Sequence, residues 1–237
     1  AGVLVCLTPT LAVMEEALAL KAKGLPVNLI FAHHPLIFGG LSAVVTGDSV
    51  GDMVQAAIAH KIGIYTAHTN FDQVTDGTAD VLAQLLALND VLPLAPTAPH
   101  TEAASGYGRV GNLPTAQPLQ TLFETIQKVL TPPKLLYSPT ANLQASVSRV
   151  AVLGGSGASY TSAAVQAGAQ VYLTADCKFH QFQESRDQGI VLVDAGHYAT
   201  ERPACERLVN WCTQQGATFA QLSDQDEDFR QFLSPNI

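Results

Sequence analysis

Short apolar segments alternate with helical segments along this chain, and this alternation constrains the fold more than any other feature of the sequence. Val3–Leu7 and Val27–Phe31 are apolar segments too short for helices, and between them apolar residues recur at helical spacing from Leu11 to Leu18. Fully apolar strands separated by helices are typical of sheets that helices cover on both faces. The sequence therefore predicts an α/β fold.

The same order of strands and helices recurs in the second half of the chain. Further strands are predicted at Ile64–Thr66, Arg149–Leu153, Val171–Thr174 and Ile190–Val193, and further helices at Ser49–Lys61 with Ser49 as its cap, Asp76–Leu88, Ser159–Ala167 and Thr200–Cys212. We interpret this order as an internal duplication. It gives a first α/β unit at residues 1–92, a second at 149–237 that completes a shared site, and a connector at 93–148 with one amphipathic helix.

Composition and charge exclude several classes of protein. The chain has 237 residues, of which 47% are hydrophobic and only 14% charged, so it is globular and not intrinsically disordered. A net charge of −8 disfavours binding to nucleic acid and to anionic lipid. No apolar run approaches the roughly 18 residues of a membrane span, and the opening AGVLVCLTPT does not resemble a signal peptide. We expect a cytoplasmic protein that does not enter membranes.

The four cysteines show no paired spacing, so we expect reduced, packed thiols and no disulfide or zinc knot. Cys205 and Cys212 are seven residues apart on one predicted helix, which places both on one face and indicates core packing. His60 and His100 are expected to be solvent-exposed.

Histidines and acids follow the predicted strands in both halves. Each half has a histidine just after a strand and an acid four residues later, and the first half adds a histidine pair after its second strand. The carboxyl ends of strands in α/β folds open into the ligand crevice, so these side chains are expected to converge. The six candidate ligands are His33, His34, His68, Asp72, His197 and Glu201.

Imidazole nitrogens and carboxylate oxygens suit zinc, iron, manganese or nickel, and one tetrahedral zinc would use only four of them. Six candidates, two of them acids able to bridge, favour two divalent ions, which can acidify a water and polarise the oxygen under attack. Any one of these histidines alone would more often be an ordinary surface or core residue. Their joint arrangement favours the metal site.

Two weaker signals leave alternatives open. GGSG at Gly154–Gly157 lies between a strand and a helix, where its amides could hold a phosphate, but a plain tight turn explains it equally well. Asp176, Lys178 and His180 follow another strand and either support the metal site or act as acid or base, or else form an ion pair on an exposed loop.

Six segments of the sequence carry a family resemblance. The segments are, in order, FAHHPLIFGG, YTAHTNFD, GRVGNLP, VAVLGGSGASY, YLTADCKFH and VDAGHYATE. Their order and sequences resemble the GTP cyclohydrolase I type 2 family, also called Nif-three-like proteins. The resemblance implies two similar, intertwined α/β units with mixed sheets covered by helices, and a ring-shaped homohexamer. It also implies a dinuclear metal site whose ligands are His33, His34, Asp72, His197 and Glu201, with His68 as a lesser ligand or a supporting group.

The chain departs from this family in two respects. Family members begin with a helical segment before the first strand, whereas this chain opens at that strand and without Met, so we expect part of the native protein to be absent. The connector is short, so the chain resembles the compact form of the family, without an inserted central domain.

The family name implies hydrolytic opening of the purine ring of GTP. The cations that could meet a triphosphate are few, namely Lys178, Arg109 and Arg202. A broader interpretation is a metal-dependent hydrolase for a nucleotide or another small anionic substrate, with His68, Asp176 and His180 as candidate catalytic groups. The alternative is a non-enzymatic metal-binding or metal-delivery protein, or an interaction module in a ring assembly.

Overall fold

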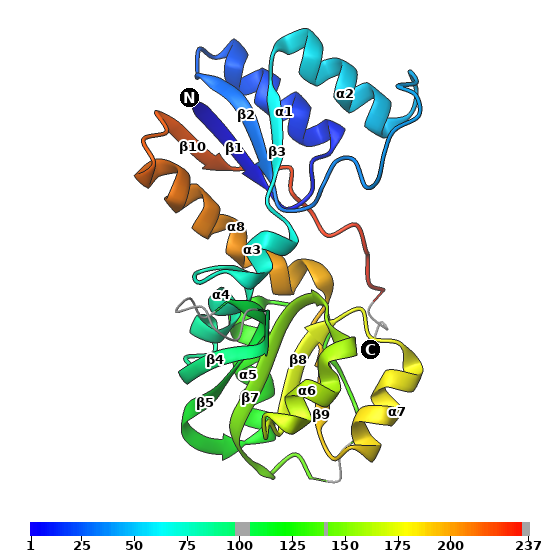
Figure 1. Ribbon diagram of the computed structural model, residues 1–237, viewed down its shortest axis with the longest axis vertical. Coiled ribbons are helices and arrows are strands. Elements are labelled where there is room, and N and C mark those ends of the chain that lie inside the picture. Colours follow the sequence, from blue (N-terminus) through cyan, green and yellow to red (C-terminus); the bar gives the residue numbers. More distant parts are fainter. Residues whose placement is uncertain (98–104, 140–141, 234–237) are drawn as a thin grey trace. The chain divides into compact units, whose positions relative to one another are not determined.

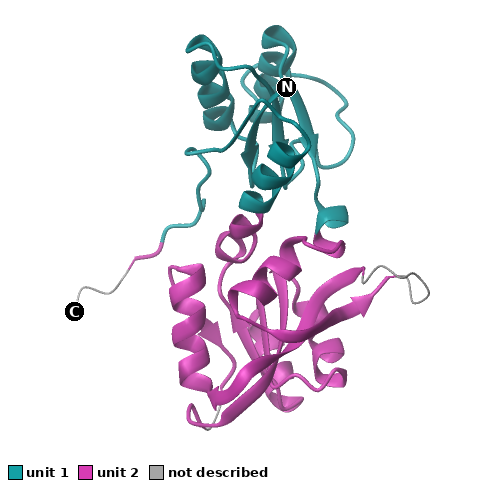
Figure 2. Ribbon diagram, turned by 90° about the vertical axis from the view of Figure 1, so that its left-hand side faces the viewer, with its two compact units in different colours: residues 1–71, 205–231 teal, residues 72–204, 232–237 magenta. Residues whose placement is uncertain are grey.

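The computed structural model describes residues 1–97, 105–139 and 142–233, which form two compact units. Unit 1 comprises Ala1–Phe71 and Cys205–Gln231, and unit 2 comprises Asp72–Ala204 with the chain from Phe232 onward (Figure 2). The chain therefore passes between the units three times, and neither unit is one continuous segment.

Unit 1 is built on a four-stranded parallel sheet in the order β10-β1-β2-β3 (Figure 1). Its elements are β1 (Gly2–Cys6), α1 (Leu11–Ala22), β2 (Val27–Ala32), α2 (Ser49–His60), β3 (Gly63–Thr66), β10 (Phe219–Leu222) and the later part of α8 (His197–Gln214), while α3 (Thr69–Gln73) spans the boundary with unit 2.

The central strand of this sheet is buried on both faces, as its uniformly apolar sequence predicts. All five residues of β1 are buried. Leu4 packs on one face with Met14 of α1 and Met53 of α2. On the other face, Phe31 of β2 meets Trp211 of α8 with ring centroids 6.3 Å apart. Helices therefore cover both faces of the sheet.

Unit 2 is built on a six-stranded mixed sheet in the order β4-β5-β7-β8-β9-β6. Its elements are α4 (Thr78–Leu85), β4 (Asn89–Pro96), β5 (Gly106–Pro118), α5 (Leu119–Leu130), β6 (Leu136–Tyr137), β7 (Ser146–Ser156), the 3-10 turn η1 (Ala158–Tyr160), α6 (Thr161–Gln166), β8 (Val171–Ala175), α7 (Phe179–Asp187), β9 (Val191–Asp194) and the start of α8.

Alternate residues of β7 face two separate cores. Val150 and Val152 pack with Leu122 of α5, whereas Ala151 packs on the opposite face with Ala164 of α6. Each face of this sheet is thus closed by helices, which explains why the strand is apolar at successive positions.

The two units share a parallel core. In unit 1, β1, β2 and β3 are adjacent parallel strands, and in unit 2, β7, β8 and β9 repeat that arrangement, each with helices between the strands. The predicted fold class, two α/β units whose sheets are covered by helices, is confirmed.

The compact units do not coincide with the segments predicted from the sequence. Residues 93–148, expected as a connector, contribute β5 and α5 to unit 2, and α5 is the amphipathic helix that was predicted there. Asp48, and not Ser49, caps α2, because its side chain accepts a hydrogen bond from the amide of Gly51. Among the described residues, no helix is long and apolar enough to cross a membrane.

Candidate metal centre

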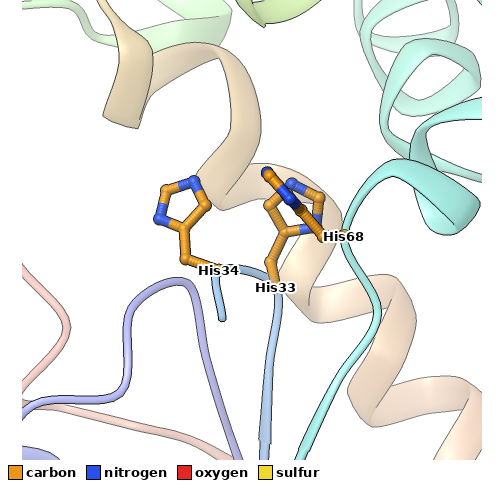
Figure 3. A group of neighbouring side chains, drawn as sticks. All are labelled: His33, His34 and His68. Atoms are coloured by element: carbon orange, nitrogen blue, oxygen red, sulfur yellow. The ribbon is translucent and has the colours of Figure 1, made fainter. Parts of the chain in front are cut away.

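Three histidines come together in unit 1. His33 and His34 follow β2, and His68 follows β3, so adjacent parallel strands deliver all three to the same edge of the sheet. Their ring centroids are 5.1 to 5.6 Å apart, and one ring nitrogen of each lies within 4.8 Å of the others (Figure 3). The convergence predicted for these three residues is confirmed within unit 1.

Two of these rings are oriented through their Nδ1 atoms. His33 is buried, and its Nδ1 lies 2.9 Å from the carbonyl oxygen of Ala67. Because a carbonyl only accepts, Nδ1 carries the proton and neutral His33 keeps its lone pair on Nε2. His34 Nδ1 lies 2.8 Å from Thr8 Oγ1. Contacts of this kind hold the rings of metal-binding histidines in position.

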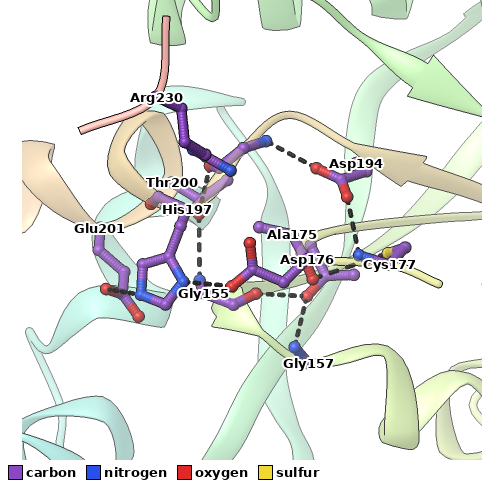
Figure 4. Close-up of polar contacts among 12 residues, drawn as sticks. Gly155, Gly157, Ala175, Asp176, Cys177, Asp194, His197, Thr200, Glu201 and Arg230 are labelled. Carbon is purple, nitrogen blue, oxygen red and sulfur yellow. Dashed lines mark hydrogen bonds and ion pairs between the residues drawn. The ribbon is translucent and has the colours of Figure 1, made fainter. Parts of the chain in front are cut away.

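The other three predicted ligands lie in unit 2. His197 is the first residue of α8 and Glu201 lies one turn later, with His197 Nε2 2.8 Å from Glu201 Oε2 (Figure 4). Asp72 offers a carboxylate oxygen within 4.8 Å of one from Glu201. Its Oδ1 accepts a hydrogen bond of 2.7 Å from Thr78 Oγ1. Unit 2 thus gathers one imidazole and two carboxylates.

The electrostatics of His197 favour a cation at this place. Burial alone would lower the pKa of His197, but the hydrogen bond and charge of Glu201, followed by those of Asp176, raise it to about 9. The ring is therefore protonated at neutral pH in the absence of metal. Positive charge is stabilised where the predicted centre would hold a metal ion.

The Gly154–Gly157 segment makes room for Glu201 instead of binding an anion. A Cβ on Gly155, whose φ is +64°, would lie 2.1 Å from Glu201 Oε1. The amides of Gly155 and Gly157 each donate to a threonine hydroxyl, of Thr200 and Thr174 respectively, at 3.0 Å. Phosphate binding by these two amides is therefore wrong. The simple-turn alternative is also wrong, since β7 runs through Ser156.

Asp176 is the one weaker candidate that joins this group, because its Oδ2 lies 2.5 Å from His197 Nδ1. Lys178 and His180 are exposed at the start of α7. His60 is exposed as expected, whereas His100 lies outside the described residues.

Arg109 is not available to an anionic substrate, which corrects the interpretation made from the sequence. Its side chain is 2% exposed and pairs with Asp80 at 2.5 Å. It also donates to the carbonyl oxygens of Gly106, Gly108 and Val74. The guanidinium thus ties β5 to the segment around α4. Cys205 and Cys212 are buried and reduced, which confirms their predicted core role.

Several residues that orient the ligands carry no sequence signal. Thr8 follows the first predicted strand and Thr78 lies six residues after Asp72, but neither belongs to a predicted pair of histidine and acid, and Ala67 contributes only its backbone carbonyl. Only the folded chain identifies them.

The donors fit a metal ion. The imidazole nitrogens of unit 1, and the imidazole and carboxylates of unit 2, are ligands typical of zinc, iron, manganese or nickel. The oriented Nδ1 atoms and the positive charge favoured at His197 support the same interpretation. The described residues therefore include groups able to hold a metal.

Residues 1–224 match the model of a family described as Duf34/NIF3 (NGG1p interacting factor 3). The chain belongs to the NIF3 family. It is 61% identical over 233 residues to a protein of Nostoc sp. named GTP cyclohydrolase 1 type 2 homolog, covering 98% of this chain and 85% of that protein. A Lactococcus lactis protein of the same name is 35% identical over 190 residues, covering 80% and 70%.

Solved structures confirm the NIF3 fold. A Staphylococcus aureus hypothetical protein superposes with a TM-score of 0.84 at 26% identity, covering 98% of this chain and 87% of that one. A Bacillus cereus protein related to NIF3 gives 0.83 at 23% identity, covering 98% and 89%. At 23% identity, the similarity to the Bacillus cereus protein shows the fold alone. The resemblance read from the sequence segments is thereby confirmed.

Proposed function

We propose that this NIF3-family protein binds two divalent metal ions and uses them to hydrolyse a nucleotide or another small anionic substrate. The proposed ligands are His33, His34, Asp72, His197 and Glu201, with His68 beside them. The observation that carries the proposal is that His33, His34 and His197 each have Nδ1 engaged by another group of the protein. This arrangement leaves Nε2 as the metal-facing atom of each ring.

The number of donors supports two ions. Unit 1 offers three imidazoles and unit 2 offers one imidazole and two carboxylates, whereas a single tetrahedral ion takes four ligands. Carboxylates are the ligands that bridge paired ions, and each half of the duplicated sequence supplies one. That all six donors serve one centre is part of the proposal, supported by the family resemblance and by the shared order of strands and ligands.

When bound, such ions would lower the pKa of a water molecule and polarise the substrate group under attack. Residues that do not bind the metal would orient the ligands and would donate or accept protons. Since the carboxylate of Asp176 is engaged by His197, it is a poor candidate for proton transfer to substrate. His68 and the exposed His180 are the remaining candidates for acid or base among those predicted from the sequence.

The substrate class rests on weaker support than the metals. The curated relatives carry the name GTP cyclohydrolase 1 type 2 homolog, which suggests a nucleotide. With Arg109 buried against Asp80, the cations proposed to meet an anionic substrate reduce to Lys178 and Arg202. This scarcity favours, as a second candidate, a metal-binding or metal-delivery protein without turnover.

Metal analysis of the purified protein tests the proposal. After loading with zinc, iron or manganese and removal of free ions, we expect two ions per chain. Asp72→Ala or Glu201→Ala should lose half or more of the bound metal, because less negative charge then separates the ions. Glu206→Ala, an exposed acid on the same helix as Glu201, is the matched control and should keep both ions.

Saturation of the wild type at one ion, or at none, would refute the dinuclear centre. Full retention of two ions by both acid variants would refute these ligands. Metal-dependent turnover in a screen of nucleotides and small phosphorylated metabolites would identify an enzyme, whereas stoichiometric metal transfer without turnover would favour the delivery function.

We further propose a cytoplasmic homohexamer that does not bind nucleic acid, on the strength of the family resemblance and the net charge of −8. Six chains of 25.0 kDa would sediment as a particle of about 150 kDa, six times the mass of one chain. A monomer by sedimentation velocity would contradict this assembly.

A further inference from the structure

Asp176 has an unusual backbone conformation directly after β8. Its φ is +54°, in the left-handed region that residues with a side chain rarely adopt. Aspartate and asparagine adopt this region more readily than other residues with a side chain. Here it directs the carboxylate at His197, with Asp176 Oδ2 2.5 Å from His197 Nδ1 (Figure 4).

A second acid, Asp194, holds both partners of this contact in place. Asp194 ends β9 and is 8% exposed. Its Oδ2 accepts a hydrogen bond of 2.8 Å from the amide of Cys177, and its Oδ1 accepts one of 2.8 Å from the amide of Gly196. One buried carboxylate thus joins the residue after Asp176 to the residue before His197.

These contacts have a chemical consequence for the imidazole. A carboxylate accepts but does not donate, so its contact with Nδ1 requires the proton to be on Nδ1. Nε2 also faces a carboxylate, that of Glu201, so a metal held by Nε2 would take the place of the Nε2 proton while Nδ1 keeps its proton against Asp176. The carboxylate of Asp176 also makes Nε2 a stronger metal ligand and prevents rotation of the ring.

We propose that Asp176 is a positioning residue of the metal centre, acting through His197, and that Asp194 clamps the two loops that bring them together. This inference rests on the proposed function, since it concerns how firmly a metal is held. It adds two acids that do not themselves need to touch the metal.

The left-handed backbone at residue 176 allows a sharp test. Asp176→Gly removes the carboxylate while keeping a residue that adopts positive φ without strain, and Asp176→Asn keeps an acceptor and also tolerates this conformation. Asp90→Gly is the matched control, because Asp90 is exposed, has a φ of +51° and accepts only from Asn112 among the contacts described for it.

Zinc affinity is measured by competition with a chromophoric chelator at constant pH. Loss of a group that orients a metal ligand typically lowers affinity 10- to 100-fold, and this is the range expected for Asp176→Gly. Asp176→Asn should lose less than Asp176→Gly. Asp194→Asn, which leaves one acceptor for two amides, should also weaken binding, whereas Asp90→Gly should match the wild type.

Nitrogen NMR of the zinc-loaded protein supplies a readout that a general loss of stability would not change. In the wild type, His197 should bind zinc through Nε2 and carry its proton on Nδ1. In Asp176→Gly, we expect the nitrogen resonances of His197 to broaden, or to show zinc bound partly through Nε2 and partly through Nδ1.

The outcomes separate this inference from the proposed function. If the wild type binds no zinc, the metal function is refuted, and with it the role of Asp176. If the wild type binds zinc and Asp176→Gly binds it equally well with His197 unchanged, only the positioning role is refuted. An unfolded Asp176→Gly would leave the decision to Asp176→Asn, whose unchanged affinity and His197 signal would likewise refute it.

Discussion

Removal of metal should make the stability of this protein depend on pH through His197. The pKa of His197 is raised to about 9 in the folded protein, against an ordinary value of 6.5, because Glu201 and Asp176 outweigh the opposing effect of burial. A raised pKa means that the folded state binds the proton more tightly than the unfolded state. The stabilisation is therefore complete below pH 6.5 and is lost as the pH rises through about 9.

The size of the effect follows from the shift. A difference of about 2.5 between the two pKa values corresponds to about 3.4 kcal/mol, at 1.36 kcal/mol for each pKa unit. The side chains of His197 and Asp176 are 31% and 38% exposed, so solvent screens part of this attraction. We therefore expect the free energy of unfolding of the metal-free protein to fall by about 2 kcal/mol between pH 6 and pH 9.5.

Urea denaturation in the presence of a chelator measures the free energy of unfolding at each pH. His197→Gln is the reference, because the contributions of all other titrating groups cancel when its value is subtracted from that of the wild type. Far-UV circular dichroism is the suitable signal, because the single tryptophan, Trp211, belongs to unit 1 and His197 to unit 2. The stability advantage of the wild type over His197→Gln should be about 2 kcal/mol larger at pH 6 than at pH 9.5. An advantage that stays constant or grows with pH would refute the reasoning.

Two further substitutions test other contacts. Gly155→Ala should displace the carboxylate of Glu201 and lower zinc affinity at least tenfold. Gly189→Ala is the control, because Gly189 has a similar positive φ but no atom within 4 Å of the new Cβ, and it should keep the affinity of the wild type. Equal zinc affinity of the two variants would contradict this prediction. Arg109→Met should lower the free energy of unfolding by about 3 to 5 kcal/mol, since it leaves Asp80 without its buried partner, and a urea-measured loss below about 1 kcal/mol would show that Asp80 finds another partner.

The central strands of both units could be predicted from the sequence because each is apolar over successive residues. The strands β4 and β5 were missed for a physical reason. Their sequences contain prolines, glycines and polar residues, and β5 is half exposed toward Pro118, so local composition resembles a loop. Their pairing with each other and with β7 supplies hydrogen bonds that local composition does not encode. β10, a four-residue strand, depends in the same way on pairing with β1.

Sequence reasoning placed His33, His34 and His68 among six side chains expected to converge, because strand ends are readable and parallel strands share an edge. It could not identify which contact each ring makes. The role of Asp194 depends on two backbone amides from different loops, and nothing in a one-dimensional pattern indicates that a carboxylate reaches both.

The division of unit 1 into two distant segments has a consequence for synthesis on the ribosome. β1 is made long before its neighbour β10, which follows 216 residues later, counted from Cys6 to Leu222. At 5 to 20 residues per second, one edge of this wholly apolar strand waits about 10 to 40 seconds for its partner. The main segment of unit 2, Asp72–Ala204, ends only 18 residues before Leu222, so it too is made while this edge is still open. The edge of β1 therefore stays open and prone to aggregation until β10 is made, which makes the pairing of β10 with β1 the step at which folding of unit 1 is most vulnerable.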